Sequence, residues 1–176
     1  MSDEPDDFAK LIASLDPPMA VVTTASDRER AGCLIGFHAQ SSIEPERYVV
    51  WLSKANHTFR VGVHAQHFAV HFLGEDDMEL ARLFGTESGD DVDKFAHCAW
   101  QPGPEGVPVL TDCLHRFTAT RVALLDEGGD HVCVVLQPVE VAPSSPFSPL
   151  RLSRTTHLTP GHESEERPEP ASKRVP

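Results

Sequence analysis

The sequence predicts a mainly β protein, an antiparallel barrel of about six strands decorated by short helices. Three observations support this prediction. Six β-rich runs are joined by short polar links or turns, the helical patterns are few and short, and 11 Gly and 15 Pro residues provide frequent turns. A chain of 176 residues is long enough for one domain with a sizeable core.

The first predicted element is a helix within residues 6–16. Its apolar residues recur at helical spacing: Phe8, Leu11, Ile12 and Leu15. Acidic residues in the first turn suit the helix dipole, and Pro17 and Pro18 end the pattern. Three β-rich runs follow at 19–25, 31–42 and 47–53, and an antiparallel meander is their simplest arrangement.

The second half of the chain alternates helices and strands. The predicted elements are a short helix from Asn56, a strand at 67–73, a helix at 75–85 ending at Gly85, a long Gly-, Pro- and acid-rich excursion at 86–110, and a hairpin at 115–142. The turn of that hairpin is "DEGGD", residues 126–130. We therefore divide the chain into an N-terminal helical extension at 1–17, a barrel domain at 18–142, and a Pro-, Ser- and charge-rich tail at 143–176 whose end we expect to be disordered.

Charge and hydropathy exclude several classes of function. The formal charge of −12 disfavours binding to nucleic acid or to an anionic membrane surface. No run of about 18 apolar residues could span a bilayer. The acidic first residues, "MSDEPDDFAK", do not fit a secretory signal, so we expect a cytoplasmic protein.

Cysteine and histidine spacing predicts no metal site. The four cysteines are widely separated and form no CxxC pair, so we expect them to be reduced and mostly buried: Cys33, Cys98, Cys113 and Cys133. His67 and His71 fall in a strand pattern, where four residues span about 13 Å, too far for one ion. The sequence also contains no GxSxG elbow, P-loop or GxGxxG motif.

The stretch "GFHAQSSIEP", residues 36–45, is unusually polar for a link between two apolar runs. Gly36 allows close approach of the backbone to a flat ligand, and the following side chains can form hydrogen bonds. Taken alone, the stretch favours a polar β-turn in which Ser and Gln face solvent over a ligand site.

The order of several short motifs resembles the flavin reductase-like family of the FMN-binding split barrel. These motifs are "VVTT", the stretch from Gly32 to Pro45, "SKANHT", "HFAVHFL", "LARLFG", "DKF", Trp100, "GVPVL" and "GGDHVCVV". The resemblance covers about residues 18–142 and implies a six-stranded antiparallel split β-barrel with short helices and Greek-key-like connections. It also implies a homodimer that binds FMN or FAD at the subunit interface, uses NAD(P)H to reduce it, and supplies reduced flavin to a partner monooxygenase.

The same resemblance implies three groups of site residues. The wall along the isoalloxazine ring would comprise Gly36, Phe37, His38, Ala39, Gln40, Ser41 and Ser42. The phosphate would be held by Ser53, Lys54, Asn56 and Thr58. His131 would contact the nicotinamide, and Lys94 and Phe95 would approach the flavin or the other subunit, although a salt bridge and a core anchor are equally compatible with those two.

This chain departs from the family pattern at Phe37, His38 and Gln40, and again at Leu136 to Pro138. The sequence therefore leaves two alternatives to a reductase. One is a flavin-binding module that does not bind nicotinamide productively, and the other is a split-barrel oxidoreductase that uses the deazaflavin F420.

Overall fold

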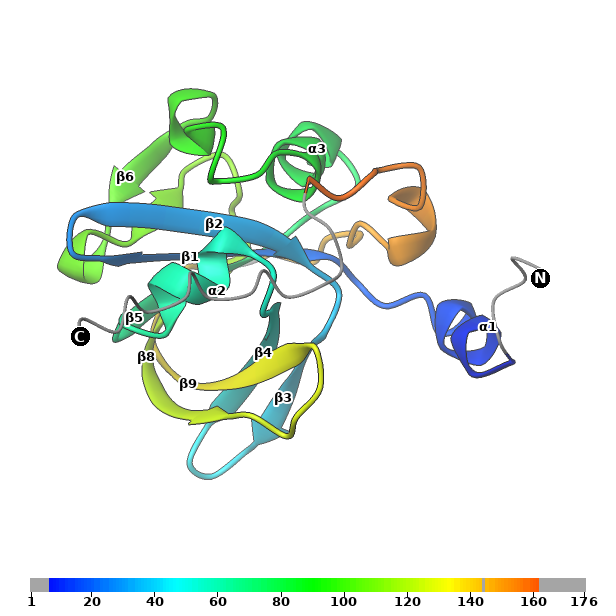
Figure 1. Ribbon diagram of the computed structural model, residues 1–176, viewed down its shortest axis with the longest axis horizontal. Coiled ribbons are helices and arrows are strands. Elements are labelled where there is room, and N and C mark those ends of the chain that lie inside the picture. The colour runs from blue at the N-terminus through cyan, green and yellow to red at the C-terminus, as the bar shows by residue number, and fades with distance from the viewer. Residues whose placement is uncertain (1–6, 144, 162–176) are drawn as a thin grey trace, which may run out of the picture.

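The computed structural model describes residues 7–143 and 145–161. Its centre is a curled, seven-stranded antiparallel sheet in the order β2-β1-β5-β8-β9-β4-β3 (Figure 1). The strands are β1 (Ala20–Ser26), β2 (Glu29–Ile35), β3 (His38–Ser42), β4 (Arg47–Ser53), β5 (His67–Phe72), β8 (Arg116–Leu125) and β9 (His131–Val141). The mainly β class with a split barrel is confirmed.

The strand count is seven rather than six because the predicted run at 31–42 divides into two strands. It breaks at Gly36 and Phe37, after which β2 and β3 lie at opposite edges of the sheet. Only these two residues join the edges, so the sheet must curl until its edges approach each other. The backbone N–H of Trp51 in β4 donates to the carbonyl of Phe37 at 3.0 Å and fixes the crossing.

The predicted helices are confirmed as α1 (Asp7–Ser14), α2 (His57–Gly62) and α3 (Met78–Thr86). Asn56 caps α2, since its side-chain oxygen accepts from the N–H of Thr58 at 2.9 Å. Helix α3 continues one residue beyond Gly85 and buries Ala81 and Phe84.

The excursion at 86–110 is ordered. It contains the 3-10 helices η1 (Lys94–Ala96) and η2 (Pro104–Gly106) and a small sheet of β6 (Trp100–Pro102) with β7 (Pro108–Leu110). The predicted hairpin is also present, as β8 paired with β9. Pro138 pairs with Ala119 beside a shift of register, which accommodates a residue that cannot donate to the ladder.

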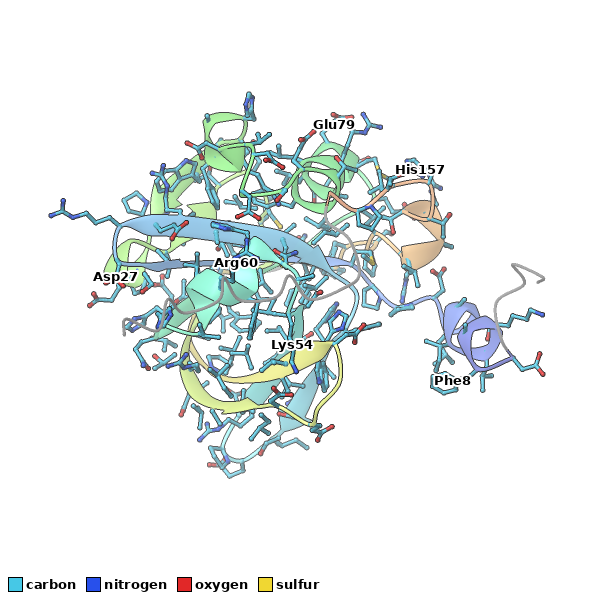
Figure 2. The ribbon with its side chains drawn as sticks, viewed as in Figure 1. Phe8, Asp27, Lys54, Arg60, Glu79 and His157 are labelled. Atoms are coloured by element: carbon cyan, nitrogen blue, oxygen red, sulfur yellow. The ribbon has the colours of Figure 1, made fainter. Side chains whose placement is uncertain are left out.

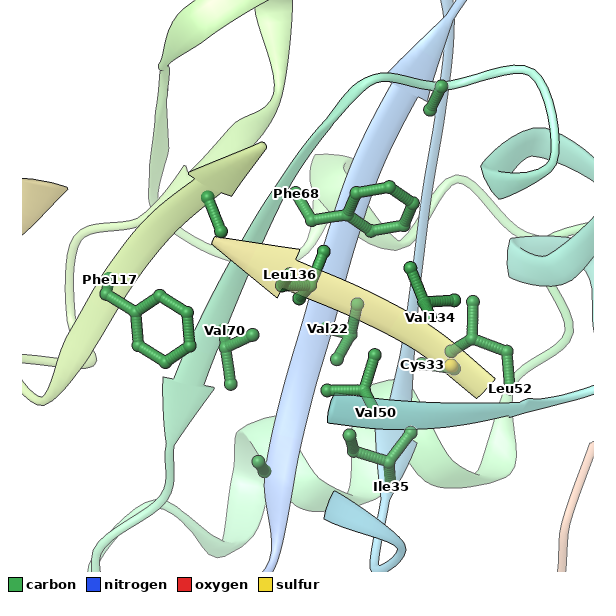
Figure 3. Close-up of a cluster of buried hydrophobic side chains, with 13 residues drawn as sticks. Val22, Cys33, Ile35, Val50, Leu52, Phe68, Val70, Phe117, Val134 and Leu136 are labelled. Carbon is green, nitrogen blue, oxygen red and sulfur yellow. The ribbon is translucent and has the colours of Figure 1, made fainter. Parts of the chain in front are cut away.

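Hydrophobic side chains fill both faces of the central strands. Inside the barrel a cluster includes Val22, Val50, Phe68, Val70 and Leu136 (Figure 3). A second cluster lies under α3 and the excursion and includes Val21, Leu73, Phe84, Leu110 and Leu150. The adjacent β1 residues Val21 and Val22 thus pack into different clusters, as expected from the alternation of side chains along a strand.

The tail packs against the barrel as far as it is described. Leu150 is 1% exposed, its N–H donates to the carbonyl of Leu73, and its carbonyl accepts from the N–H of Met19. The 3-10 helix η3 (Leu152–Arg154) follows. The part of the tail that we expect to be disordered is 160–176; Pro160 and Gly161 are described, and the rest lies outside the described residues.

The cysteines are unpaired and, apart from the half-buried Cys98, buried, as predicted. Within residues 7–143 and 145–161, no helix is long and apolar enough to cross a membrane. The same described residues contain no group of three His, Cys, Asp or Glu side chains placed to hold a metal ion.

Candidate functional site

A cavity of about 1020 Å³ opens where the barrel is split, beside the crossing from β2 to β3. One wall comes from that crossing and from the adjoining ends of β4 and β9. The opposite wall comes from α1, α3 and the C-terminal segment. Its lining includes Ile12, Leu15, Met19, Gly36, Phe37, His38, Trp51, Ser53, Asn56, Glu87, Asp130, His131, Leu152, Thr155, Leu158 and Pro160.

Gly36 and His38 shape the first wall. Gly36 lies beside Met19, and a Cβ at Gly36 would stand 3.5 Å from the sulfur of Met19, an ordinary van der Waals contact. Nε2 of His38 lies 2.8 Å from the carbonyl of Pro18, and Nδ1 lies 2.7 Å from the hydroxyl of Tyr48. A carbonyl can only accept, so Nε2 carries the proton and Nδ1 accepts from the tyrosine. His38 therefore connects β3 to the segment before β1.

Burial keeps both members of this pair neutral. Desolvation lowers the pKa of His38, with partial compensation from its bond to Pro18. Desolvation also raises the pKa of Tyr48 to about 12. His38 thus positions the adjacent Phe37 by a fixed hydrogen-bond geometry and carries no charge into the cavity at neutral pH.

Phe37 and His131 face each other at the cavity. Their ring centroids are 5.1 Å apart at an interplanar angle of 57°, and 54% of Phe37 is exposed. Nδ1 of His131 lies 2.8 Å from the carboxylate of Asp130, which lowers the pKa of Asp130. That pairing orients the imidazole, so its Nε2 lies on the side of the ring away from Asp130. Phe37, predicted to lie along the flavin ring, and His131, predicted to contact the nicotinamide, are therefore neighbours at the cavity.

Ser53 and Asn56 are the lining residues closest in sequence to the predicted phosphate-binding lysine. Lys54 lies between them in sequence, but its ammonium is 3.0 Å from the carboxylate of Asp126 (Figure 2 labels Lys54). The charged side chains that line the cavity are Glu87 and Asp130, and no lysine or arginine does so among the described residues. A phosphate bound here would have to draw Lys54 away from Asp126.

The other sequence-predicted residues do not line the cavity. Ala39, Gln40, Ser41 and Ser42 continue along β3, a strand paired only with β4 within the described chain. The remaining three, Thr58, Lys94 and Phe95, are 1%, 4% and 7% exposed.

Lys94, which the sequence predicted to lie near the ligand, is buried away from the cavity. Its ammonium donates to the carbonyls of Gly32 and Phe84 at 3.0 and 3.3 Å and lies 5.5 Å from the Phe84 ring centre. Desolvation lowers its pKa. A lysine in a loop is usually a surface charge, whereas this one bridges β2 and α3 in the interior.

Sequence reasoning missed the second wall. Ile12 and Leu15 come from α1, and Leu152, Thr155, Leu158 and Pro160 come from the tail. The only signal was the helical spacing of Ile12 and Leu15, because isolated apolar residues in a Pro- and Ser-rich tail form no pattern.

Comparison with known proteins agrees with this geometry. A family model described as "Flavin reductase like domain" matches residues 12–156. The chain belongs to the flavin reductase-like family. The match includes residues on both walls of the cavity, Ile12 and Leu15 of α1 and Leu152 and Thr155 of the tail among them, as well as the central strands.

Curated relatives support the same family. The chain is 30% identical over 151 residues to the NADH:riboflavin 5'-phosphate oxidoreductase of Streptomyces pristinaespiralis, covering 82% of this chain and 81% of that one. It is 28% identical over 150 residues to the reductase component of the flavin-dependent trigonelline monooxygenase of Acinetobacter baylyi. That match covers 83% of this chain but 46% of the relative, and the chain spans 44% of another relative from Rhizobium meliloti.

Solved structures share the fold. A flavin reductase domain protein from Arthrobacter sp. FB24 superposes with a TM-score of 0.73 at 23% identity, covering 82% of this chain and 87% of that chain. At this level of identity the similarity supports the split-barrel fold of the flavin reductase-like family.

Proposed function

We propose that this chain is an NAD(P)H-dependent flavin oxidoreductase that binds FMN or FAD in the cavity at the split of the barrel. The observation that carries the proposal is the convergence of Gly36, Phe37 and His131 on a large, mainly apolar cavity. Its volume of about 1020 Å³ lies at the upper end of the usual range for small-molecule sites, roughly 300–1,000 Å³. The relative from Streptomyces pristinaespiralis is named for NADH and riboflavin 5'-phosphate, which favours FMN and NADH.

The residues present fit a flat, three-ring cofactor. Gly36, Phe37 and Trp51 offer backbone and aromatic surface on one side, while the aliphatic residues of α1 and the tail cover the other. Polar residues are a minority of the lining, as in most cofactor sites; they are His38, Ser53, Asn56, Glu87, Asp130, His131 and Thr155. When bound, the flavin supplies the acceptor for a hydride, and the protein provides its binding and orientation.

The edge of β3 is the second element that we assign to the ring. Residues Ala39 to Ser42 continue along β3 from the cavity wall without lining the cavity, and β3 is paired on one side only within the described chain. Its outward backbone N–H groups are therefore available to the heteroatoms of a ring, and such fixed dipoles stabilise negative charge on a reduced cofactor. We assign Ser53, Lys54 and Asn56 to the phosphate and His131 to the nicotinamide.

We further propose that the protein acts as a homodimer and supplies reduced flavin to a partner monooxygenase. Several relatives are named as reductase components of monooxygenase systems, among them the trigonelline protein and one for 4-nitrophenol from Rhodococcus opacus. An open cavity that holds flavin mostly by apolar contacts suits a cofactor that must leave after reduction. We expect the protein to work in the cytoplasm.

The decisive experiment measures NADH and NADPH oxidation by the full chain with and without added FMN, FAD or F420. FMN- or FAD-dependent oxidation is expected, together with quenching of flavin fluorescence on binding. Binding without oxidation would favour the flavin-binding module, and activity with F420 alone would favour the deazaflavin enzyme. If none of the three cofactors bound at micromolar concentration, the proposal would be overturned.

The phosphate assignment has its own test. Lys54→Ala should weaken FMN binding about tenfold and leave riboflavin binding nearly unchanged, because only FMN offers a charged phosphate. The matched control is Arg82→Ala, which removes an exposed cation paired with Glu79 outside the cavity. Equal losses for FMN and riboflavin would contradict the assignment.

A further inference from the structure

Lys54, just after β4, is bound to both ends of the turn that joins β8 to β9. Its ammonium lies 3.0 Å from the carboxylate of Asp126, the first residue of the turn. Its backbone N–H donates to the carbonyl of Asp130, the last residue, at 2.9 Å, and Figure 2 shows Lys54 beside the start of β9. Asp130 and the following His131 line the cavity, so Lys54 links the turn to the cavity wall.

The turn itself is open. Residues 126–130 are all exposed, and a Cβ added at Gly128 or Gly129 would meet no atom of the described chain within 4 Å. The carboxylate of Asp126 accepts from the N–H of Gly128 at 2.8 Å. That bond and, after it, the ammonium of Lys54 lower the pKa of Asp126, so the carboxylate is charged at neutral pH. The ion pair with Lys54 therefore ties an exposed, charged turn to the barrel.

The two members of this ion pair differ in burial. The side chain of Lys54 is 15% exposed, whereas that of Asp126 is 52% exposed. Asp126 can turn to water at little cost, because exposed ion pairs contribute little and its bond to Gly128 can remain. Lys54 stays mostly buried and needs an anionic partner. The ion pair is thus built so that another anion can replace the carboxylate.

Three other cations are less available to a ligand than Lys54. A guanidinium nitrogen of Arg60 lies 2.6 Å from both carboxylate oxygens of Asp90. Arg121 donates to two backbone carbonyls at the end of α2 at 3.1 and 2.8 Å. Lys94 is buried against two backbone carbonyls. Of these four cations, Lys54 is the one that an anionic ligand can recruit most easily.

We infer that Asp126 is a specificity-determining residue, a carboxylate that competes with the phosphate of the ligand for Lys54. A phosphate displaces it, because phosphate carries more negative charge and more acceptor oxygens than a carboxylate. A flavin without phosphate leaves the ion pair intact, so Asp126 weakens the binding of FMN and not that of riboflavin. Such weakening suits a cofactor that leaves after reduction. The inference rests on the proposed function for the identity of the ligand.

The first test removes the charge of Asp126 and keeps its shape. Asp126→Asn retains an oxygen that can accept from the N–H of Gly128, so the turn should persist. FMN should bind about two- to fivefold more tightly than to the parent, the range expected for release of an exposed ion pair, with riboflavin binding unchanged. The matched control, Glu127→Gln, removes the same charge from the next exposed residue and should have a smaller effect. Equal gains in the two variants, by fluorescence quenching, would overturn the inference.

A double-mutant cycle separates competition for Lys54 from simple repulsion of phosphate. In Lys54→Ala the carboxylate of Asp126 has no ammonium to occupy, so adding Asp126→Asn should change FMN affinity no more than Glu127→Gln does. An equal effect with and without Lys54 would show direct repulsion and refute competition. A purely structural anchor would instead lower the temperature of thermal unfolding and leave the ratio of FMN to riboflavin affinity unchanged, which would also refute it.

The displacement itself can be observed without any activity. NMR titration of the Asp126 carboxyl reports its pKa in the parent alone, with FMN and with riboflavin. FMN should raise the pKa of Asp126 toward its ordinary value, because Lys54 has moved to the phosphate, and riboflavin should leave it lowered. If bound FMN left this pKa unchanged, Lys54 would still hold Asp126 and the inference would be wrong.

The two proposals can fail separately. If FMN and riboflavin both bind but Asp126→Asn leaves the ratio of their affinities unchanged, the proposed function stands and the competition fails. If neither flavin binds, the flavin assignment fails, and millimolar inorganic phosphate then probes Lys54 directly. A pKa of Asp126 that rises in phosphate, but not in chloride at equal ionic strength, would support competition for another phosphorylated ligand, and an unchanged pKa would refute it.

Discussion

The central strand β5 and the edge strand β3 obey opposite constraints. Strand β5 pairs with β1 on one side and β8 on the other, and Phe68, Ala69, Val70 and His71 are buried. Strand β3 pairs only with β4 within the described chain, and its three middle residues are exposed. Packing determines the residues of β5, whereas the outer edge of β3 is available to a ligand or a second copy. The sheet therefore separates packing at its centre from the exposed split where we propose that flavin binds.

The largest expected effect comes from the centre. Phe68 is fully buried inside the barrel, and Phe68→Ala should lower the free energy of unfolding by about 3–5 kcal/mol because it leaves a cavity that the strands cannot close. Urea unfolding of the parent and the variant measures the difference. A loss below about 1 kcal/mol would show that the centre of the sheet does not carry the stability.

The buried His71 of β5 makes the stability of the centre of the sheet depend on pH. Its Nδ1 lies 3.1 Å from the carbonyl of Val21, and its Nε2 accepts from the N–H of Leu110 at 3.0 Å, so the buried ring is a neutral bridge between β1, β5 and β7. Desolvation lowers the pKa of His71 from 6.5 to about 4. The unfolded chain therefore binds a proton that the folded chain excludes.

The sign of the effect follows from that difference. The stabilising contribution of neutral His71 to the free energy of unfolding is fully present above pH 6.5. It falls by on the order of 3 kcal/mol as the pH drops toward 4. Urea unfolding between pH 7.5 and 4 should show a steeper loss in the parent than in His71→Gln, which is less stable at pH 7.5 but has no proton to gain there. Equal slopes would contradict this role for His71.

The sequence predicted the centre of the sheet better than its split. A β-rich run such as 67–73 is recognisable from residue type, and the hairpin β8–β9 from its Gly-Gly turn. The break at Gly36 and Phe37 was not predicted, although the chain becomes polar there, because only the curl of the sheet requires two separate strands at 31–42. Composition could not place Lys94 either, since its acceptor carbonyls lie 62 and 10 residues away in the chain.

The wall of the cavity that α1 and the tail form could not be predicted for a related reason. Leu150 anchors the tail by burial and by backbone bonds to Leu73 and Met19, and a single leucine among Pro and Ser residues has no periodicity. The helical spacing in α1 predicted a helix with one apolar face but could not say what that face covers. Elements with repeated local patterns are predictable, whereas contacts that join distant segments depend on the completed fold.

The smallest effect on stability, and the sharpest test of the split, concerns Phe37. Its ring is about half exposed and contacts His131 on the same wall of the cavity, so Phe37→Ala should change the free energy of unfolding by less than about 1 kcal/mol. Loss of an aromatic contact of about 0.5–1.5 kcal/mol should nevertheless weaken FMN binding by roughly two- to tenfold. Val122→Ala is the matched control, because Val122 is 51% exposed on β8 and does not line the cavity. Titration of FMN fluorescence, with sedimentation to confirm equal oligomeric state, should separate the two variants, and an equal affinity would show that exposed apolar residues at the split have no special role in binding.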